Sequence, residues 1–187
     1  MNPVAKSRTY RMILCALFAA LIAVGAFLRV PIPYVPFTLQ TFFVALAGLL
    51  LGKKLGAVSA LVYMAIGLIG IPVFTEGGGI AYVLKPTFGY IVGFVLGAYV
   101  TGAIARKVET PSLGRLIAAV FAGFGVTYLL GMTYFYFMSN FYLGKAIGVG
   151  TVLLYCFLVF VPGNGVMGVI AALVAKRMIP VLNKNQL

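Results

Sequence analysis

Long apolar runs constrain the fold of this chain more than any other feature of its sequence. Of its 187 residues, 63% are hydrophobic and only 9% are charged, whereas a soluble domain is about half apolar and about a quarter charged. One hydrophobic core cannot bury so much apolar surface, so lipid must solvate part of it. A spanning helix needs about 20 mostly apolar residues. The runs therefore predict a single all-α membrane domain over residues 1–187, a bundle of six transmembrane helices at 12–28, 37–52, 55–71, 87–105, 116–138 and 146–175.

Positive charge is distributed unevenly between the two predicted sides of the membrane. One side carries eleven basic residues: Lys6, Arg8, Arg11, Lys53, Lys54, Arg106, Lys107, Arg115, Lys176, Arg177 and Lys184. The other side carries three, Arg29, Lys85 and Lys145. Because basic residues accumulate in cytoplasmic loops, both termini are predicted to be cytoplasmic. This placement between apolar runs also explains the basic composition without nucleic-acid binding.

Two irregular segments lie on the less basic, outer side. Residues 30–36 contain three prolines, which remove backbone donors and restrict the residues before them. Residues 72–86 contain three consecutive glycines between two prolines. Irregular backbone near a membrane must be buried in protein or line a polar cavity. The two segments predict an outward-facing binding site, with a purely structural outer cap as the alternative.

The usual parts of catalysis and energy coupling are missing from the sequence. It has no His and no Asp, and its two acids, Glu76 and Glu109, fall in loops on opposite sides of the membrane. An acid–base pair or an intramembrane proton relay is therefore not expected. No phosphate-binding loop occurs, and Cys15 and Cys156 lack metal-site spacing. We expect no enzyme activity, no cofactor and no metal, and any uphill transport must draw energy from a partner.

Small residues recur at helical spacing in the first apolar run. Ala16 and Ala20 share one face of the predicted helix, and Ala19 and Ala23 share a neighbouring face. Small residues on a face let another membrane helix approach closely. Either face is a candidate for contact with a partner subunit, and packing within the bundle is the alternative.

Polar residues mark the start of the second predicted helix. Thr38 and Gln40 follow the proline-rich segment and precede an apolar run. Thr38 is a candidate helix cap as well as a candidate ligand contact. A buried glutamine amide needs hydrogen-bond partners, which either a ligand or the neighbouring loop can supply.

The second irregular segment offers backbone amides, aromatic rings and a cation. Gly78 and Gly79 allow tight turns, a mobile gate or close approach of backbone amides to a ligand. Tyr82 and Tyr90 present flat faces with polar tips. Lys85 is suited either to an anionic ligand group or to anchoring at the interface.

Pro162-Gly163 interrupts the last apolar run, and Asn164 and Met167 follow three residues apart. A helix that restarts after Pro-Gly leaves backbone amides unpaired. Asn164 is a candidate cap for that restart. Alternatively, Asn164 and Met167 both face one cavity.

Taken in order, these motifs resemble the BioY family, the biotin-specific S components of energy-coupling factor (ECF) transporters. The resemblance covers nearly the whole chain. It is carried by the alanine-rich first run, Pro-Phe-Thr-Leu-Gln, Gly-Gly-Gly-Ile-Ala, Lys-Pro-Thr-Phe-Gly-Tyr and the late Pro-Gly motif. It implies an S-component-like six-helix protein of the bacterial plasma membrane with an outward biotin pocket. It also implies a transmembrane T component, contacted by the alanine face at Ala16 and Ala20 or at Ala19 and Ala23, and two ATPase subunits.

The late motif departs from the family pattern, which has Asp followed three residues later by Lys. This chain has Asn164 and Met167 in those places. An Asn carbonyl still accepts from a ureido N–H, but neutral hydrogen bonds are roughly half as strong as charge-assisted ones. The departure predicts weaker biotin binding, and restoring both charges is expected to strengthen it. A structural or assembly subunit and a membrane enzyme are the competing hypotheses.

Overall fold

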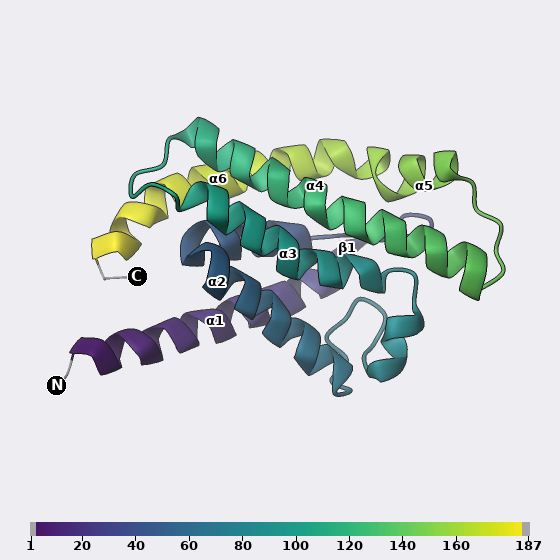
Figure 1. Cartoon of the computed structure of the whole chain (residues 1–187), viewed down its shortest axis with the longest axis horizontal. Helices are drawn as coiled ribbons and strands as arrows, with labels where there is room; N and C mark the ends of the chain where they lie inside the picture. Colours follow the sequence, from purple (N-terminus) through teal and green to yellow (C-terminus); the bar gives the residue numbers. More distant parts are fainter. Residues whose placement is uncertain (1–2, 185–187) are drawn as a thin grey trace.

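The computed structural model describes residues 3–184, with side chains for residues 8–182. Six α-helices lie roughly along one long direction (Figure 1). They are α1 Pro3–Phe27, α2 Gln40–Leu68, α3 Phe88–Ala105, α4 Leu113–Phe137, α5 Val149–Cys156 and α6 Val161–Lys184. Shorter elements join them: strands β1 Arg29–Val30 and β2 Phe37–Thr38, 3-10 helices η1 Ile80–Leu84 and η3 Leu158–Phe160, and a π-helical turn η2 Met138–Tyr142.

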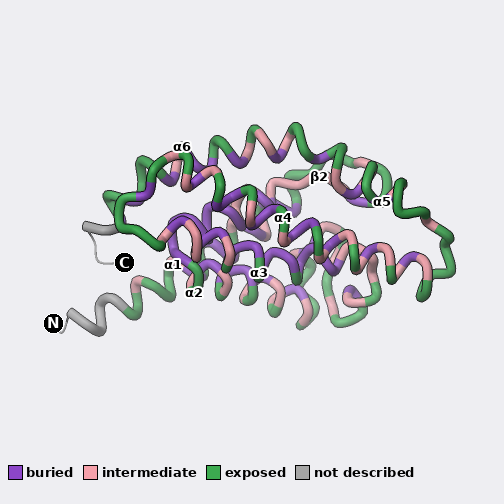
Figure 2. Tube along the Cα trace, turned by 45° about the horizontal axis from the view of Figure 1, so that its top comes forward, coloured by how far each residue is buried: buried purple, intermediate pink, exposed green. Residues whose placement is uncertain are grey.

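Helix α3 lies at the centre of the bundle. It packs between α2 and α4, and α1 and α6 lie further out. Small residues permit the close approach of α3 to α4: a β-carbon added to Gly123 would lie 2.7 Å from the carbonyl oxygen of Gly97. Figure 2 shows the buried residues gathered along α3 and the exposed ones along the outer helices. Many exposed side chains are large and apolar, as expected of a surface that faces lipid.

Helix α2 reverses direction at Gly52. Gly52 has a φ of +79°, which a glycine adopts without steric cost. The chain folds back there, so a β-carbon on Gly56 would meet the backbone of Gly48. The two arms of α2, 40–51 and 53–68, correspond to the helices predicted at 37–52 and 55–71. Within residues 3–184, five helices are long and apolar enough to span a membrane when α2 is taken as one, so the predicted count of six stays a prediction.

The predicted helix at 146–175 is broken at a different residue from the one expected. The break falls at Phe157, which has φ −141° and ψ −65° between α5 and η3. Pro162 lies instead in the first turn of α6. Proline is tolerated there because the first helical N–H groups have no partner within the helix. The prediction of a break at Pro162-Gly163 was therefore wrong.

A short antiparallel hairpin leads from α1 into α2. Strand β1 pairs with β2 through Arg29 opposite Thr38 and Val30 opposite Phe37. The backbone N–H of Leu39 also donates to the carbonyl of Leu28 at 3.1 Å. Residues 37–38 are thus extended, although the sequence predicted that the second helix begins at 37. The hairpin holds the proline-rich loop against the start of α2.

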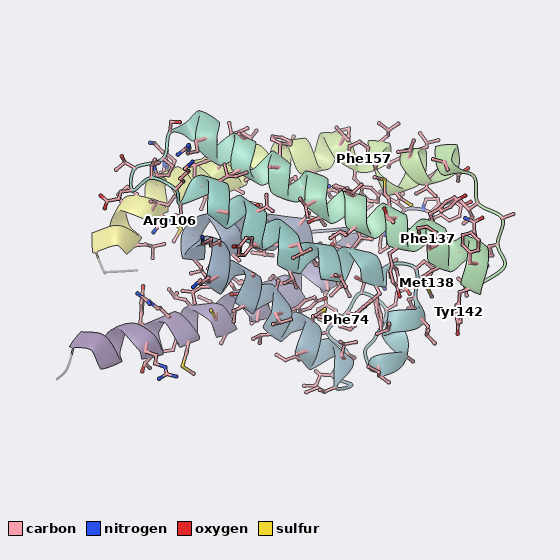
Figure 3. All side chains as sticks on the ribbon, in the orientation of Figure 1. Phe74, Arg106, Phe137, Met138, Tyr142 and Phe157 are labelled. Carbon is pink, nitrogen blue, oxygen red and sulfur yellow. The ribbon has the colours of Figure 1, made fainter. Side chains whose placement is uncertain are left out.

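Most of the basic residues belong to segments at one end of the bundle. The start of α1, the end of α6 and the α3–α4 connection lie together there (Figure 1). The turn at Gly52 lies at the same end, since a β-carbon on Gly52 would lie 3.7 Å from the side chain of Arg106. Figure 3 labels Arg106 at this end, and Phe74, Met138 and Tyr142 towards the other. That this basic end is cytoplasmic stays a prediction.

Candidate functional site

A cavity lies where the two irregular segments meet the helices. It encloses about 590 Å³ of atom-free space, its mouth included. The proline-rich loop, β2, α2, the glycine-containing loop, η1, α3, α4, η3 and α6 all contribute to its walls. The lining residues are Val35, Pro36, Phe37, Thr38, Gln40, Thr41, Thr75, Glu76, Tyr82, Thr87, Tyr90, Ile91, Phe94, Tyr128, Phe160 and Asn164.

Aromatic rings form one continuous wall of the cavity. Phe37 stacks on Phe160 with ring centroids 6.0 Å apart, and Phe160 stacks on Tyr128 at 6.1 Å. Tyr90 meets Tyr128 edge to face at 5.9 Å, and its hydroxyl donates to the carbonyl of Cys156 at 2.9 Å. Phe157, labelled in Figure 3, supports Tyr128 from the side at 5.3 Å. Such a wall accepts the flat apolar face of a small molecule.

Gln40 organises the polar groups on the loop side of the cavity. Its side chain is buried, with 4% of the residue exposed. The amide oxygen accepts from the hydroxyls of Thr38 at 3.2 Å and Thr75 at 3.4 Å. The amide nitrogen donates to the hydroxyl of Tyr63 at 2.7 Å, which donates onward to the carbonyl of Val73. Because an amide nitrogen has two protons, one remains for another acceptor.

Asn164 organises a second group of polar contacts at the cavity. Its oxygen accepts from the hydroxyl of Thr41 at 2.9 Å, and its nitrogen donates to the hydroxyl of Tyr128. Both bonds are buried, and 4% of Asn164 is exposed. The side chain therefore joins α2, α4 and α6. Asn164 lies inside α6, and its side chain bonds to residues of α2 and α4. The expectation that it caps a restarted helix was therefore wrong.

Two polar contacts tie the loops at the mouth. Lys85 forms an ion pair with Glu76 at 2.8 Å, and its nitrogen lies 5.0 Å from the centre of the Tyr82 ring. Arg29 donates to the carbonyl of Thr75 at 2.5 Å, which links the β1–β2 hairpin to the glycine-containing loop. Burial raises the pKa of the Tyr82 hydroxyl, so Tyr82 stays neutral. The mouth therefore carries two cations, Arg29 and Lys85, and one carboxylate.

Five of the nine sequence-predicted ligand residues line the cavity: Thr38, Gln40, Tyr82, Tyr90 and Asn164. Lys85 lies beside it at the mouth, paired with Glu76. Met167 is one helical turn beyond Asn164 and does not line it. Thr38, also considered as a helix cap, accepts the backbone N–H of Gln40 at 3.4 Å.

Gly78 and Gly79 support the loop rather than line the cavity. Gly79 has a φ of +97°, and its N–H donates to the carbonyl of Gly67 at the end of α2 at 2.7 Å. A β-carbon on Gly78 would lie 2.4 Å from the carbonyl oxygen of Ile71. The glycines thus permit a tight turn against α2. A ligand contact through their amides stays a prediction.

The structure distinguishes the two alanine faces of α1. Ala16 and Ala20 are exposed on the outside of the bundle. Ala19 is buried, with 3% exposed, and Ala23 is partly buried. Of the two candidate faces, Ala16 and Ala20 are therefore the pair that is accessible to another protein.

Several cavity residues had no signal in the sequence. Thr41 and Tyr128 lie within apolar helices, and Thr75 and Thr87 lie in loops. The hydroxyl oxygen of Thr87 is buried, and the Tyr82 hydroxyl lies within hydrogen-bonding reach of it. Both side chains line the cavity, so a ligand there can bond to either of them.

The arrangement is suited to binding rather than to chemistry. Within residues 3–184, no group of three or more Cys or Glu side chains is placed to hold a metal ion. The cavity instead combines apolar walls with a few convergent polar groups, which is typical of small-molecule sites. Its hydroxyls and amides can bond a neutral polar head, and its mouth can attract an anion.

Comparison with known proteins gives a consistent result. The model of the BioY family matches residues 1–184. The "Probable biotin transporter BioY" of Lysinibacillus sphaericus is 45% identical over 170 residues, which cover 91% of this chain and 87% of that protein. The "Biotin transporter BioY" of Thermotoga maritima is 42% identical over 172 residues, covering 90% and 95%.

A solved structure is similar over almost the same extent. It is the crystal structure of the S-component for biotin from an ECF-type ABC transporter. It superposes with a TM-score of 0.80 and covers 92% of each chain at 30% sequence identity. The helical architecture is therefore that of a known membrane transport component.

Proposed function

The chain belongs to the BioY family, a family of transporter S components and not of enzymes, and from that premise we propose that it captures biotin at an extracytoplasmic cavity for import. The protein is the substrate-binding subunit of an ECF-type transporter in the bacterial plasma membrane. The observation that carries the proposal is the cavity itself. It combines an aromatic wall with two buried polar side chains, Gln40 and Asn164.

The chemistry of the cavity matches the parts of biotin. Biotin has a bicyclic apolar body, a ureido head with one carbonyl and two N–H groups, and a tail that ends in a carboxylate. Tyr90, Tyr128 and Phe160 supply a surface for the rings. Asn164, Tyr128 and Thr87 supply hydrogen-bonding groups for the ureido head. Apolar walls fix the body, and the polar groups give orientation and specificity.

The carboxylate tail is directed towards the mouth. Lys85 and Arg29 are both held there by contacts with the glycine-containing loop. Glu76 lines the cavity and is paired with Lys85. An incoming carboxylate replaces part of that pairing, so binding is coupled to the position of the loop. The loop thereby closes over the bound vitamin.

Import against a gradient requires energy that this chain does not supply. Its sequence has no phosphate-binding loop and no intramembrane carboxylate. Two ATPase subunits and a T component provide that energy. The exposed Ala16 and Ala20 on α1 form the face that contacts the T component, because small side chains let a second helix approach.

Filling the cavity tests the proposal. Ile91 lines the cavity, and Val92, the next residue of α3, is 37% exposed. Ile91→Trp is expected to lower biotin binding at least about tenfold by overpacking the site, whereas Val92→Trp leaves it unchanged. Binding of radiolabelled biotin is measured on the purified chain, and uptake on cells that co-express the partners. Equal effects of the two folded variants would contradict the assignment of this cavity.

A further inference from the structure

A second cavity adjoins the first at its mouth. It contains about 550 Å³ of atom-free space, its open side included. Glu76 and Thr87 line both cavities, so the two spaces meet at these side chains. The other residues that line the second cavity are Tyr34, Leu84, Lys85, Pro86, Phe135 and Leu143.

The walls of the second cavity are mainly apolar, and contacts between the elements that form them hold them together. The ring of Tyr34, in the proline-rich loop, packs edge to face against Phe135 at 6.2 Å and against Tyr155 at 5.4 Å. The hydroxyl of Tyr134 donates to the carbonyl of Val83, which bonds α4 to η1. The proline-rich loop, η1 and α4 therefore enclose an apolar space that suits a hydrocarbon arm.

Lys85 and Glu76 place one positive and one negative charge at the second cavity. Their side chains pair at 2.8 Å and are 39% and 48% exposed. An exposed ion pair contributes little to stability, so a ligand can separate it if both charges regain partners. A ligand carboxylate alone pairs with Lys85 and leaves Glu76 without its cation. A ligand end that has both an ammonium and a carboxylate gives each side chain an opposite charge.

We propose that the second cavity binds the far end of biotin amides that carry an amino-acid group, so that the protein captures biotinyl-lysine as well as free biotin. This inference rests on the proposed function and adds a class of ligand. In biotinyl-lysine an amide joins the biotin carboxyl to the side-chain nitrogen of lysine. The biotin part lies in the first cavity and the flexible methylene arm lies along Tyr34 and Leu84. The ammonium then pairs with Glu76 and the carboxylate with Lys85.

Two ligands that differ only in the ammonium group test the charge recognition. 6-Biotinamidohexanoate has the arm and the carboxylate of biotinyl-lysine but no ammonium. Displacement calorimetry on the purified full-length chain is expected to show biotinyl-lysine binding at least about threefold more tightly, since it forms one more exposed ion pair. Glu76→Gln is expected to abolish this difference. Glu109→Gln, at the other acid of the chain, is expected to preserve it.

Filling the second cavity tests its position independently of charge. Leu84 lines this cavity and does not line the first, whereas Ile80, also in η1, lines neither. Leu84→Trp is expected to weaken binding of both conjugates at least about fivefold by overpacking, and to leave binding of free biotin unchanged. Ile80→Trp, at a side chain that is 73% exposed, is expected to change none of the three affinities.

The outcomes separate this inference from the proposed function. If the folded native chain does not bind free biotin, the proposed function fails. If it binds free biotin but holds the two conjugates equally, or if Glu76→Gln keeps their difference, only the inference fails. Equal effects of Leu84→Trp on biotin and on the conjugates also overturn it. Each variant is checked for an unchanged melting temperature. If Leu84→Trp does not fold, the comparison of native chain and Glu76→Gln decides alone.

Discussion

The Thr41 hydroxyl lies 2.9 Å from the side-chain oxygen of Asn164 and donates to it. This bond joins the beginning of α2 to the first turn of α6, across 123 positions of sequence. Both side chains are buried and both line the cavity. The packing of the bundle and the geometry of the site therefore depend on the same contact.

Removing that hydroxyl is expected to weaken both folding and binding. Thr41→Val keeps the shape of the side chain but leaves the Asn164 oxygen without its partner, which costs about 1–3 kcal/mol for a buried acceptor. Thermal unfolding in detergent measures the loss of stability, and titration with biotin measures the loss of affinity. Thr41→Ser retains the hydroxyl and is expected to retain most of both. Thr133→Val, on the exposed face of α4, is the matched control; a similar loss there would show that the bond to Asn164 is not responsible.

The ion pair at the mouth is expected to regulate recognition of the ligand carboxylate. Glu76→Gln removes the partner of Lys85 and should raise the affinity for biotin a few-fold, since an exposed ion pair is worth about 0–1 kcal/mol. Lys85→Gln should lower it by a similar factor. Biotinamide, which has no carboxylate, is expected to respond to neither change. If the affinities for biotin and biotinamide change equally in these variants, Lys85 does not bind the ligand carboxylate.

Bulk on the exposed alanine face of α1 is expected to prevent assembly with partners while sparing ligand binding. Ala16→Trp and Ala20→Trp place a large side chain where a second helix must approach closely. Co-purification with a tagged T component should fall to background in both variants. Ala118→Trp, at an exposed alanine of α4, is the control and should co-purify normally. Loss of biotin binding by the α1 variants would instead indicate a defect in folding.

Replacing Asn164 and Met167 together is expected to differ from replacing Asn164 alone. Asn164→Asp with Met167→Lys supplies a charged acceptor and a charged donor, and charge-assisted bonds are about twice as strong as neutral ones. Positions 164 and 167 are three residues apart in α6, so both charges are supplied on one side of that helix. The double variant should bind biotin about tenfold more tightly. Unchanged or lower affinity in a folded double variant contradicts this expectation.

The sequence predicted the cavity best where local chemistry marks it. Gln40 follows a proline-rich segment, and Tyr82 and Tyr90 flank a glycine- and proline-containing loop, so these residues were identifiable. Tyr128 was not, because it lies within an apolar helix where a polar side chain has no distinctive neighbours, and Thr41 follows Gln40 directly but was not singled out. Their proximity to Asn164 results from the packing of α2, α4 and α6, which local sequence does not encode.

Helix boundaries were also predicted best where local residues mark them. A short turn between the helices at 37–52 and 55–71 was predicted, and Gly52 has the positive φ that such a reversal uses. The break at Phe157 was missed, since neither proline nor glycine marks it. The break was predicted at Pro162-Gly163 instead. Pro162 lies in the first turn of α6, where proline is compatible with a helix. A proline near a helix end thus indicates a boundary without fixing its residue.

Titration of the purified native chain with biotin tests the central claim most directly. Isothermal calorimetry in detergent is predicted to give saturable heat with one biotin bound per chain. The same titration after Ile91→Trp is predicted to show at least about tenfold weaker binding. A monodisperse, thermally cooperative native chain that releases no saturable heat with biotin would contradict the account.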